Sequence, residues 1–217
     1  MLTVLDHLTA VVAGTIVLMA LLAIQTRDRV EVVEGTISDV ARRQAGSVAD
    51  ALAQEFDNAL SEPMARAALG RYRCRLARDA AGERTALVEV PAYVRTVQGG
   101  AVSAAHVQYR LVADGRTVAV GRQAVPSYRL LREVDTGSGY RAATVVAESV
   151  VDFDVKFRGR ASEVFTGGPP LRFTEVEFQV VVAVPPPRAA PGRTRTRETN
   201  RARAGFTVRP ANFATDA

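Results

Sequence analysis

The sequence is short of cysteine, histidine and lysine, and each shortage excludes a class of protein. Its 217 residues include one cysteine, Cys74, so no disulfide can form within the chain. The two histidines, His7 and His106, lie far apart in the sequence, which argues against a histidine-based metal cluster and most histidine-dependent catalytic triads. Lysine occurs once, at Lys156, so arginine supplies nearly all the positive charge behind the formal net charge of +5. We therefore expect no metal and no cofactor, and these counts argue against several classes of enzyme, although an active site built from carboxylates alone would be compatible with them.

The first segment has the composition of a membrane helix. Residues 8–24 carry no charge, and apolar residues from Leu2 onward extend this stretch to the roughly 20 residues that a membrane-spanning helix needs. The segment lacks the basic start and the cleavage site of a signal peptide. We expect residues 1–25 to be a retained transmembrane anchor; the alternative is a helix buried in the core of the protein.

The next segment is amphipathic. Apolar residues recur mostly every three or four positions, with charged and polar residues between them, which predicts a helix with one apolar face. These residues are Val30, Val33, Ile37, Val40, Ala41, Val48, Leu52, Phe56 and Leu60. No proline precedes Pro63, so the anchor and residues 26–62 are expected to form one helix of about 55 residues, about 80 Å long. Ser61 and Pro63 mark its end or a break.

Beyond residue 84, apolar and polar residues alternate, which predicts strands. The expected strands are residues 85–90, 106–113, 117–124, 128–134, 143–146, 150–157, 171–184 and 205–209. Turn signals separate some of them, at residues 114–115, 136–139 and 167–170. We expect residues 63–217 to form a β-rich domain, an antiparallel sheet covered on one side only by the long helix. The predicted fold class is α+β.

The segment Leu2-Thr3-Val4-Leu5-Asp6 and the apolar run after it resemble the start of mature type IV pilins and type II secretion pseudopilins. In that family Phe-Thr-Leu-Ile-Glu precedes a similar helix, so the resemblance places Leu2 at the methylated first residue and Asp6 at the glutamate. A carboxylate at the edge of a membrane helix usually has a partner. The resemblance implies that Asp6 pairs with the amino terminus of a neighbouring subunit. The alternative is that Asp6 is an ordinary acidic residue at a helix N-terminus.

Further segments are similar to minor pilins of the PilW and GspJ type. They are residues 51–59 at the end of the helix, 107–111 and 121–122 in a central hairpin, and 146–157, 173–180 and 206–210 in later strands. The resemblance implies a pilin-like fold and a structural role as a minor pilin or pseudopilin, which helps to initiate or cap assembly of a type IV pilus or a type II secretion pseudopilus. No enzymatic activity is implied.

The resemblance also implies partners and a location. The partners are other pilin or pseudopilin subunits, the inner membrane and, if an upstream leader exists, prepilin peptidase. The location is the inner membrane, crossed once, with the soluble domain in the periplasm or in a filament. Arg27 and Arg29, just after the apolar run, favour the opposite orientation, because positive charge tends to stay in the cytoplasm.

Residues 185–204 form a segment rich in proline and arginine, which predicts a solvated loop. The segment also supports an alternative function, a monomeric membrane-anchored periplasmic domain that binds an anionic ligand. The arginines that would hold this ligand are Arg193, Arg195, Arg197, Arg201 and Arg203. No aromatic residue lies between them to stack on bases, which argues against a nucleic acid partner.

Two further patterns could suggest a functional site, but neither favours one. The acids Asp135, Asp152, Asp154 and Glu177 lack a calcium-binding loop, and Asp152 and Asp154 share the polar side of a predicted strand, which favours a solvated face. Cys74 lies between two arginines, which could lower its pKa, but no histidine is near it in the sequence. A passive thiol is therefore predicted.

Overall fold

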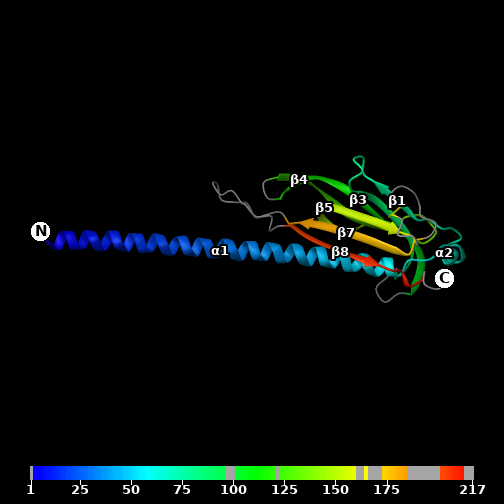
Figure 1. The fold of residues 1–217 in the computed structure, drawn as a ribbon, viewed down its shortest axis with the longest axis horizontal. Helices are drawn as coiled ribbons and strands as arrows, with labels where there is room; N and C mark the ends of the chain where they lie inside the picture. Colours follow the sequence, from blue (N-terminus) through cyan, green and yellow to red (C-terminus); the bar gives the residue numbers. More distant parts are fainter. Residues whose placement is uncertain are drawn as a thin grey trace.

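The computed structural model describes residues 2–95, 101–120, 123–159, 164–165, 173–184 and 201–212. Within these ranges the side chains of residues 2–13, 30 and 164–165 are not described. A single long helix runs out from one side of a β-sheet, with the N-terminus at its far end (Figure 1).

The helix α1 spans Leu2–Asp57, 56 residues, which confirms the prediction of one continuous helix. It ends a few residues before the predicted boundary. A second helix, α2 (Glu62–Leu69), was not predicted; Ser61 is its N-cap residue, Pro63 lies in its first turn and Gly70 closes it with a φ of 68°. The break expected at Ser61 and Pro63 is therefore the start of a new helix. Proline fits in the first turn because an N–H at this position would have no partner within the helix.

The sheet is antiparallel throughout, which confirms the α+β class. Its strands are β1 (Arg75–Arg78), β2 (Thr85–Arg95), β3 (Val102–Val120), β4 (Gln123–Asp135), β5 (Thr144–Arg158), β6 (Val164–Phe165), β7 (Glu175–Ala183) and β8 (Arg201–Val208). They are ordered β1-β2-β3-β4-β5-β7-β8, with β6 beside β5. The strand β1 was not predicted.

The predicted division between residues 106–113 and 117–124 is wrong. The turn expected at residues 114–115 lies inside β3, where the pairing with β4 shifts between Ala113 and Thr117. Asp114 Oδ1 accepts hydrogen bonds from the Arg116 N–H at 2.8 Å and the Ser127 hydroxyl at 2.8 Å, so this segment forms an irregularity in the ladder instead of a chain reversal. The predicted strand 117–124 is consequently the end of β3 and the start of β4.

The predicted strands 143–146 and 150–157 are also one strand, β5, with an irregular residue at Ser149 (φ 55°). By contrast, the turn at residues 136–139 is confirmed: Gly137 and Gly139 have positive φ and their N–H groups donate to Asp135 Oδ1 at 2.8 and 2.9 Å. The turn predicted at residues 167–170 lies outside the described residues.

The main core lies between the second half of α1 and one face of the sheet. Ala41, Ala45 and Ala49 are fully buried, and α1 packs mainly on β7 and β8. Small side chains at this spacing allow the helix to approach the strands closely. Larger residues, Leu52 and Phe56, fill the wider space near the end of the helix.

The buried stripe of α1 begins later than predicted. Ile37 is the first buried large residue, whereas Val33 is 40% exposed and Val32 is 68% exposed. The helix has already left the sheet at this point (Figure 1). The predicted apolar stripe is therefore correct only from residue 37 onward.

The sheet also curls, so the prediction that one side only is covered is wrong. Beyond the pair of Tyr128 and Val150, β5 no longer pairs with β4, and side chains from the β1–β2 hairpin cover its free edge. Thr85 Oγ1 accepts a hydrogen bond from the Val155 N–H at 2.9 Å, and Arg84 Nε donates to the Val151 carbonyl at 3.3 Å. On the face opposite the main core, a second apolar cluster forms around Val118, Val120, Val151, Val181 and Ala183.

Candidate functional site

The residues predicted to act in assembly lie on the first turns of α1. Leu2 and Asp6 belong to the helix, but their side chains are not described, so the pairing of Asp6 stays a prediction. Of the predicted anion-binding arginines, Arg201 and Arg203 lie exposed at the start of β8, so the prediction of a loop is wrong for residues 201–204. The remaining three, Arg193, Arg195 and Arg197, lie outside the described residues.

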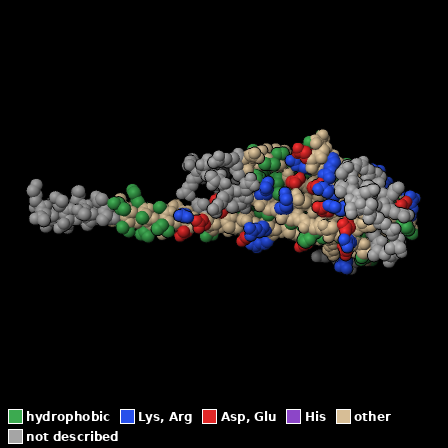
Figure 2. Space-filling view, in the orientation of Figure 1, with side chains coloured by type: hydrophobic (Ala, Val, Ile, Leu, Met, Phe, Trp, Pro, Cys, Tyr) green, Lys and Arg blue, Asp and Glu red, His purple; other side chains and the backbone are tan. Residues whose placement is uncertain are grey.

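The part of α1 before the sheet carries a nearly continuous exposed apolar surface. Each of its large apolar side chains between residues 16 and 24 is between 51% and 66% exposed; these are Ile16, Val17, Leu18, Met19, Leu21, Leu22 and Ile24. Figure 2 shows hydrophobic side chains gathered there, ahead of the first charged ones. We name these seven residues the projecting apolar surface. A helix that is apolar on all sides normally lies inside a bundle or in lipid.

A polar zone follows the projecting apolar surface. Arg27 Nε lies 3.2 Å from Glu31 Oε1, one turn further along the helix. The Thr26 hydroxyl donates a hydrogen bond to the Leu22 carbonyl at 2.7 Å, so this polar group has its partner within the helix. Within the described part of the chain, no helix is both long and apolar enough to cross a membrane.

Glu55 fastens the other end of α1 to the sheet. Its Oε1 accepts a hydrogen bond from Arg132 Nε at 2.7 Å, and its Oε2 accepts one from the Tyr109 hydroxyl. Tyr109 is buried, and burial followed by the Glu55 carboxylate raises the pKa of this tyrosine well above its ordinary value. Next to this group, the ring of Phe56 lies 5.6 Å from that of Phe178. Helix, β3, β4 and β7 are thus joined at one point.

One feature of the sequence indicates this contact. Glu55 is an acid next to Phe56 and three residues after Leu52, and both apolar residues belong to the predicted buried stripe. An acid beside such a stripe needs a partner when the helix packs. That partner, Arg132, is far away in the sequence and could not be identified from it.

A second buried polar group lies three residues further along β3 and β4, on the opposite face of β2, β3 and β4. Asp135 is buried and lies 2.6 Å from Arg71, and its Oδ1 accepts the two amide hydrogen bonds of the following turn. Burial opposes ionisation of Asp135, but the Gly137 and Gly139 amides and the Arg71 charge outweigh it, so the pKa of this carboxyl is lowered. The acid is therefore an ionised structural anchor for the turn.

The same group contains Glu89 and His106, both buried. The Tyr140 hydroxyl donates to Glu89 Oε1 at 2.5 Å, and Arg73 Nη1 lies 3.9 Å from the same oxygen. Burial lowers the pKa of His106, whose Nε2 has no hydrogen-bond partner in the structure described. Among the described residues, no three side chains are grouped so that they could hold a metal ion. No sequence motif indicated a role for Glu89.

Of the other candidate acids, Asp152 accepts a hydrogen bond from Gln179 Nε2 at 3.4 Å, and the remaining two lie in separate ion pairs. Asp154 pairs with Arg78 and lies 3.2 Å from Lys156 Nζ, and Glu177 lies 2.6 Å from Arg158 Nη2. The prediction of a solvated face is therefore wrong for Asp154, because the β1–β2 hairpin reaches across to it. Neither Asp154 nor Glu177 is free to act as a general base.

Cys74 is a passive thiol, as predicted. It is buried, and burial raises the pKa of its thiol to about 12. A thiol of this kind stays protonated at neutral pH and is a poor nucleophile.

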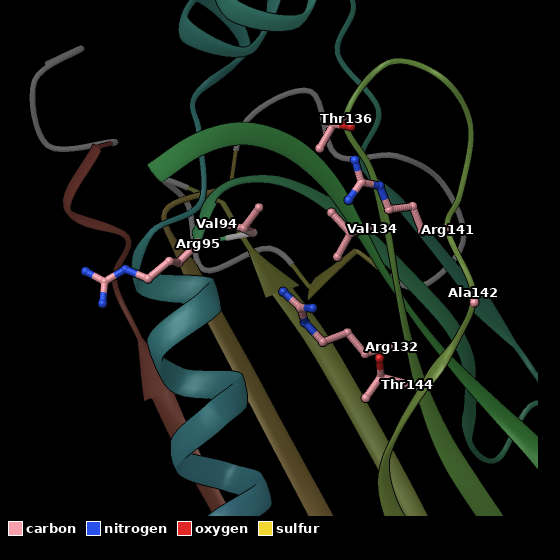
Figure 3. Close-up of a pocket in the computed structure, with 8 residues that line it drawn as sticks. All are labelled: Val94, Arg95, Arg132, Val134, Thr136, Arg141, Ala142 and Thr144. Carbon is pink, nitrogen blue, oxygen red and sulfur yellow. The ribbon is translucent and has the colours of Figure 1, made fainter. Parts of the chain in front are cut away.

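A cavity of about 150 Å³ lies between the end of β2, β4 and the connection from β4 to β5. Figure 3 shows that Arg132 and Arg141 point toward it, whereas Arg95 points away at its rim. Arg132 is already paired with Glu55. The lining includes no acid, histidine or cysteine, so the cavity supplies no general base.

Comparison with models of known protein families found no match, and comparison with curated protein sequences found none either. Function is therefore inferred from the features above. The most prominent of them is the projecting apolar surface, which nothing in the described structure covers.

Proposed function

We propose that the chain is a minor pilin or pseudopilin, a structural subunit that helps to initiate or cap a type IV pilus or a type II secretion pseudopilus. One observation carries this proposal: α1 is a single helix whose second half is buried on the sheet while its first part projects and exposes apolar side chains. Such a surface needs cover from lipid or from other helices, because exposed apolar area of this extent is unfavourable in water.

The sequence of the projecting part supports the same proposal. Residues 8–24 are uncharged, which suits a single-pass state in the inner membrane before assembly, with the β-domain in the periplasm. As we propose, Asp6 then pairs with the amino terminus of a neighbouring subunit. A charge pair inside an apolar bundle neutralises the acid and fixes the axial position of one helix against the next.

The experiment compares two acids of the same helix. The full chain is expressed in its native host as Asp6→Ala and as the control Asp28→Ala; Asp28 is exposed beyond the apolar run. Complexes are extracted in detergent, and co-purifying subunits are quantified by mass spectrometry. We expect Asp6→Ala to reduce co-purification about tenfold or more, which corresponds to about 1.4 kcal/mol of pairing, and Asp28→Ala to leave it unchanged.

The opposite result would favour the monomeric binding domain. In that case Asp6→Ala leaves the binding of the anionic ligand intact, and no pilin-like subunit co-purifies. Ligand binding is instead lost when five arginines are neutralised together, namely Arg193, Arg195, Arg197, Arg201 and Arg203. Sequencing of the amino terminus adds an independent test. A methylated first residue at Leu2 supports the processing that the proposal requires, and an unmodified Met1 on an isolated monomer contradicts it.

A further inference from the structure

The strand β8 ends the sheet, and its outer edge has no partner strand in the described structure. All eight of its residues pair with β7 in continuous register. Apart from Arg201, none of its residues has a hydrogen bond outside this pairing among the described contacts. An edge of this kind presents a row of N–H and C=O groups to which another extended chain can bind.

No described strand lies beyond β8, which packs on α1 through Ala202 and Ala204 on one face, whereas the opposite edge of the sheet is protected. There, β1 has only four residues and its pairing shifts between Ala77 and Arg78. Short edge strands and register shifts are common ways to prevent another chain from pairing. The strand β8 is twice as long and contains neither a proline nor a register shift.

A hollow lies on the face of β8 beside the open edge. It measures about 290 Å³ and is lined on β8 by Arg203, Gly205 and Thr207. A Cβ at Gly205 would lie 2.4 Å from the carbonyl oxygen of Phe178, so this position must lack a side chain. Domains that bind peptides by strand addition combine a free edge with a side-chain pocket in this way.

The charge of Arg203 indicates which kind of peptide strand would bind at this edge. Arg203 is exposed and forms no ion pair among the described contacts. Glu177, which also lines the hollow, is already paired with Arg158 at 2.6 Å. A second copy of the chain would bring two arginine-bearing edges together, which is unfavourable. An acidic strand would instead find a free guanidinium.

We propose that β8 binds an extended acidic peptide segment of a partner protein by strand addition. The backbone of the segment pairs with the outer edge of β8, an acidic side chain meets Arg203, and the side chain two residues along, on the same face, enters the hollow above Gly205. This site is separate from the projecting apolar surface. A result that contradicts peptide binding at β8 would therefore leave the proposed role in filament assembly untouched, and the reverse also holds.

The test uses the full chain in detergent micelles and a fluorescein-labelled peptide of eight alternating valine and glutamate residues. Binding is measured by fluorescence anisotropy. We expect Arg203→Glu to weaken binding about tenfold or more, while the control Arg129→Glu, an exposed arginine on β4, leaves it unchanged. A peptide with lysine in place of glutamate should bind at least about tenfold more weakly.

Two further measurements distinguish strand addition from attraction between charges alone. N-methylation of every second amide blocks one edge of the peptide, and of the two alternate methylated peptides only one should lose binding. Hydrogen exchange should show slower exchange at alternate amides of β8 when the unmodified peptide binds. The proposal is overturned if the peptide does not bind, if both methylated peptides bind as well as the original, or if the protected amides lie outside β8. Dimerisation of the chain through β8 would equally overturn the choice of partner.

Discussion

Replacing Glu55 with alanine tests how the long helix is fastened to the sheet. The Glu55 side chain is 17% exposed and that of its partner Arg132 is 26% exposed, so water reaches this ion pair only in part. The substitution leaves the guanidinium without its carboxylate and the buried Tyr109 hydroxyl without its acceptor. Breaking a fully buried pair costs about 3–5 kcal/mol, and an unsatisfied hydroxyl costs about 1–3 kcal/mol. Because water can still reach Arg132, we expect a loss of about 3 kcal/mol in the free energy of unfolding.

The assay is urea unfolding of the full chain in detergent, and unfolding is monitored by the near-ultraviolet circular dichroism of the tyrosines. A double-mutant cycle with Glu55→Ala, Arg132→Ala and the double variant isolates the interaction, and we expect a coupling energy of about 1.5–3 kcal/mol. The control Asp50→Ala removes an exposed acid from the same helix and should change stability by less than about 0.5 kcal/mol. A coupling energy below about 0.5 kcal/mol would refute the reasoning, because the helix would then be held by apolar packing alone.

Gly205→Ala should destabilise the sheet by about 1–3 kcal/mol, because the new Cβ would lie 2.4 Å from the Phe178 oxygen; Gly35→Ala, in open space on α1, should instead stabilise the chain by up to about 1 kcal/mol. The same urea assay checks both, and equal effects would contradict the close approach of β8 to β7. Burial lowers the pKa of His106 below its ordinary value of 6.5, so the unfolded chain binds this proton more readily than the folded chain. Stability should therefore fall as the pH drops below about 6.5, and His106→Gln should reduce this fall; equal slopes between pH 7.5 and 5.5 in both proteins would show that His106 does not contribute.

The periodicity of the sequence was sufficient to predict the main elements. Apolar residues three or four positions apart identified α1, and alternation identified β2, β3, β4, β5, β7 and β8 at least in part. Strand ends and short elements were harder, because β1 has only four residues and shows too little of any pattern. The Asp114-Gly115 pair was wrongly predicted to reverse the chain. Such a pair usually forms a turn, but here Asp114 accepts a hydrogen bond from the Ser127 hydroxyl of the neighbouring strand and stays within β3.

The polar contacts depend on partners that a single sequence does not reveal. Glu55 and Arg132 are 77 positions apart, and Arg78 and Asp154 are 76 apart. In each case an acid meets an arginine, but a chain with 28 basic residues, nearly all arginine, offers too many possible pairs. The pairs are chosen by the register of the sheet and by its curl, which arise only after the strands have assembled.

The position where α1 leaves the sheet separates two kinds of constraint on its sequence. From Ala41 onward the buried apolar residues of the helix are fixed by packing, since they belong to the main core that they form with the sheet. Before Val33 the helix contacts no other described element, so the fold of the β-domain sets no requirement there. A segment free of that requirement would be expected to be polar, because a polar helix surface is more favourable in water. The projecting apolar surface is instead among the most apolar parts of the chain, and this departure is what supports the proposed contacts with lipid or with the helices of other subunits.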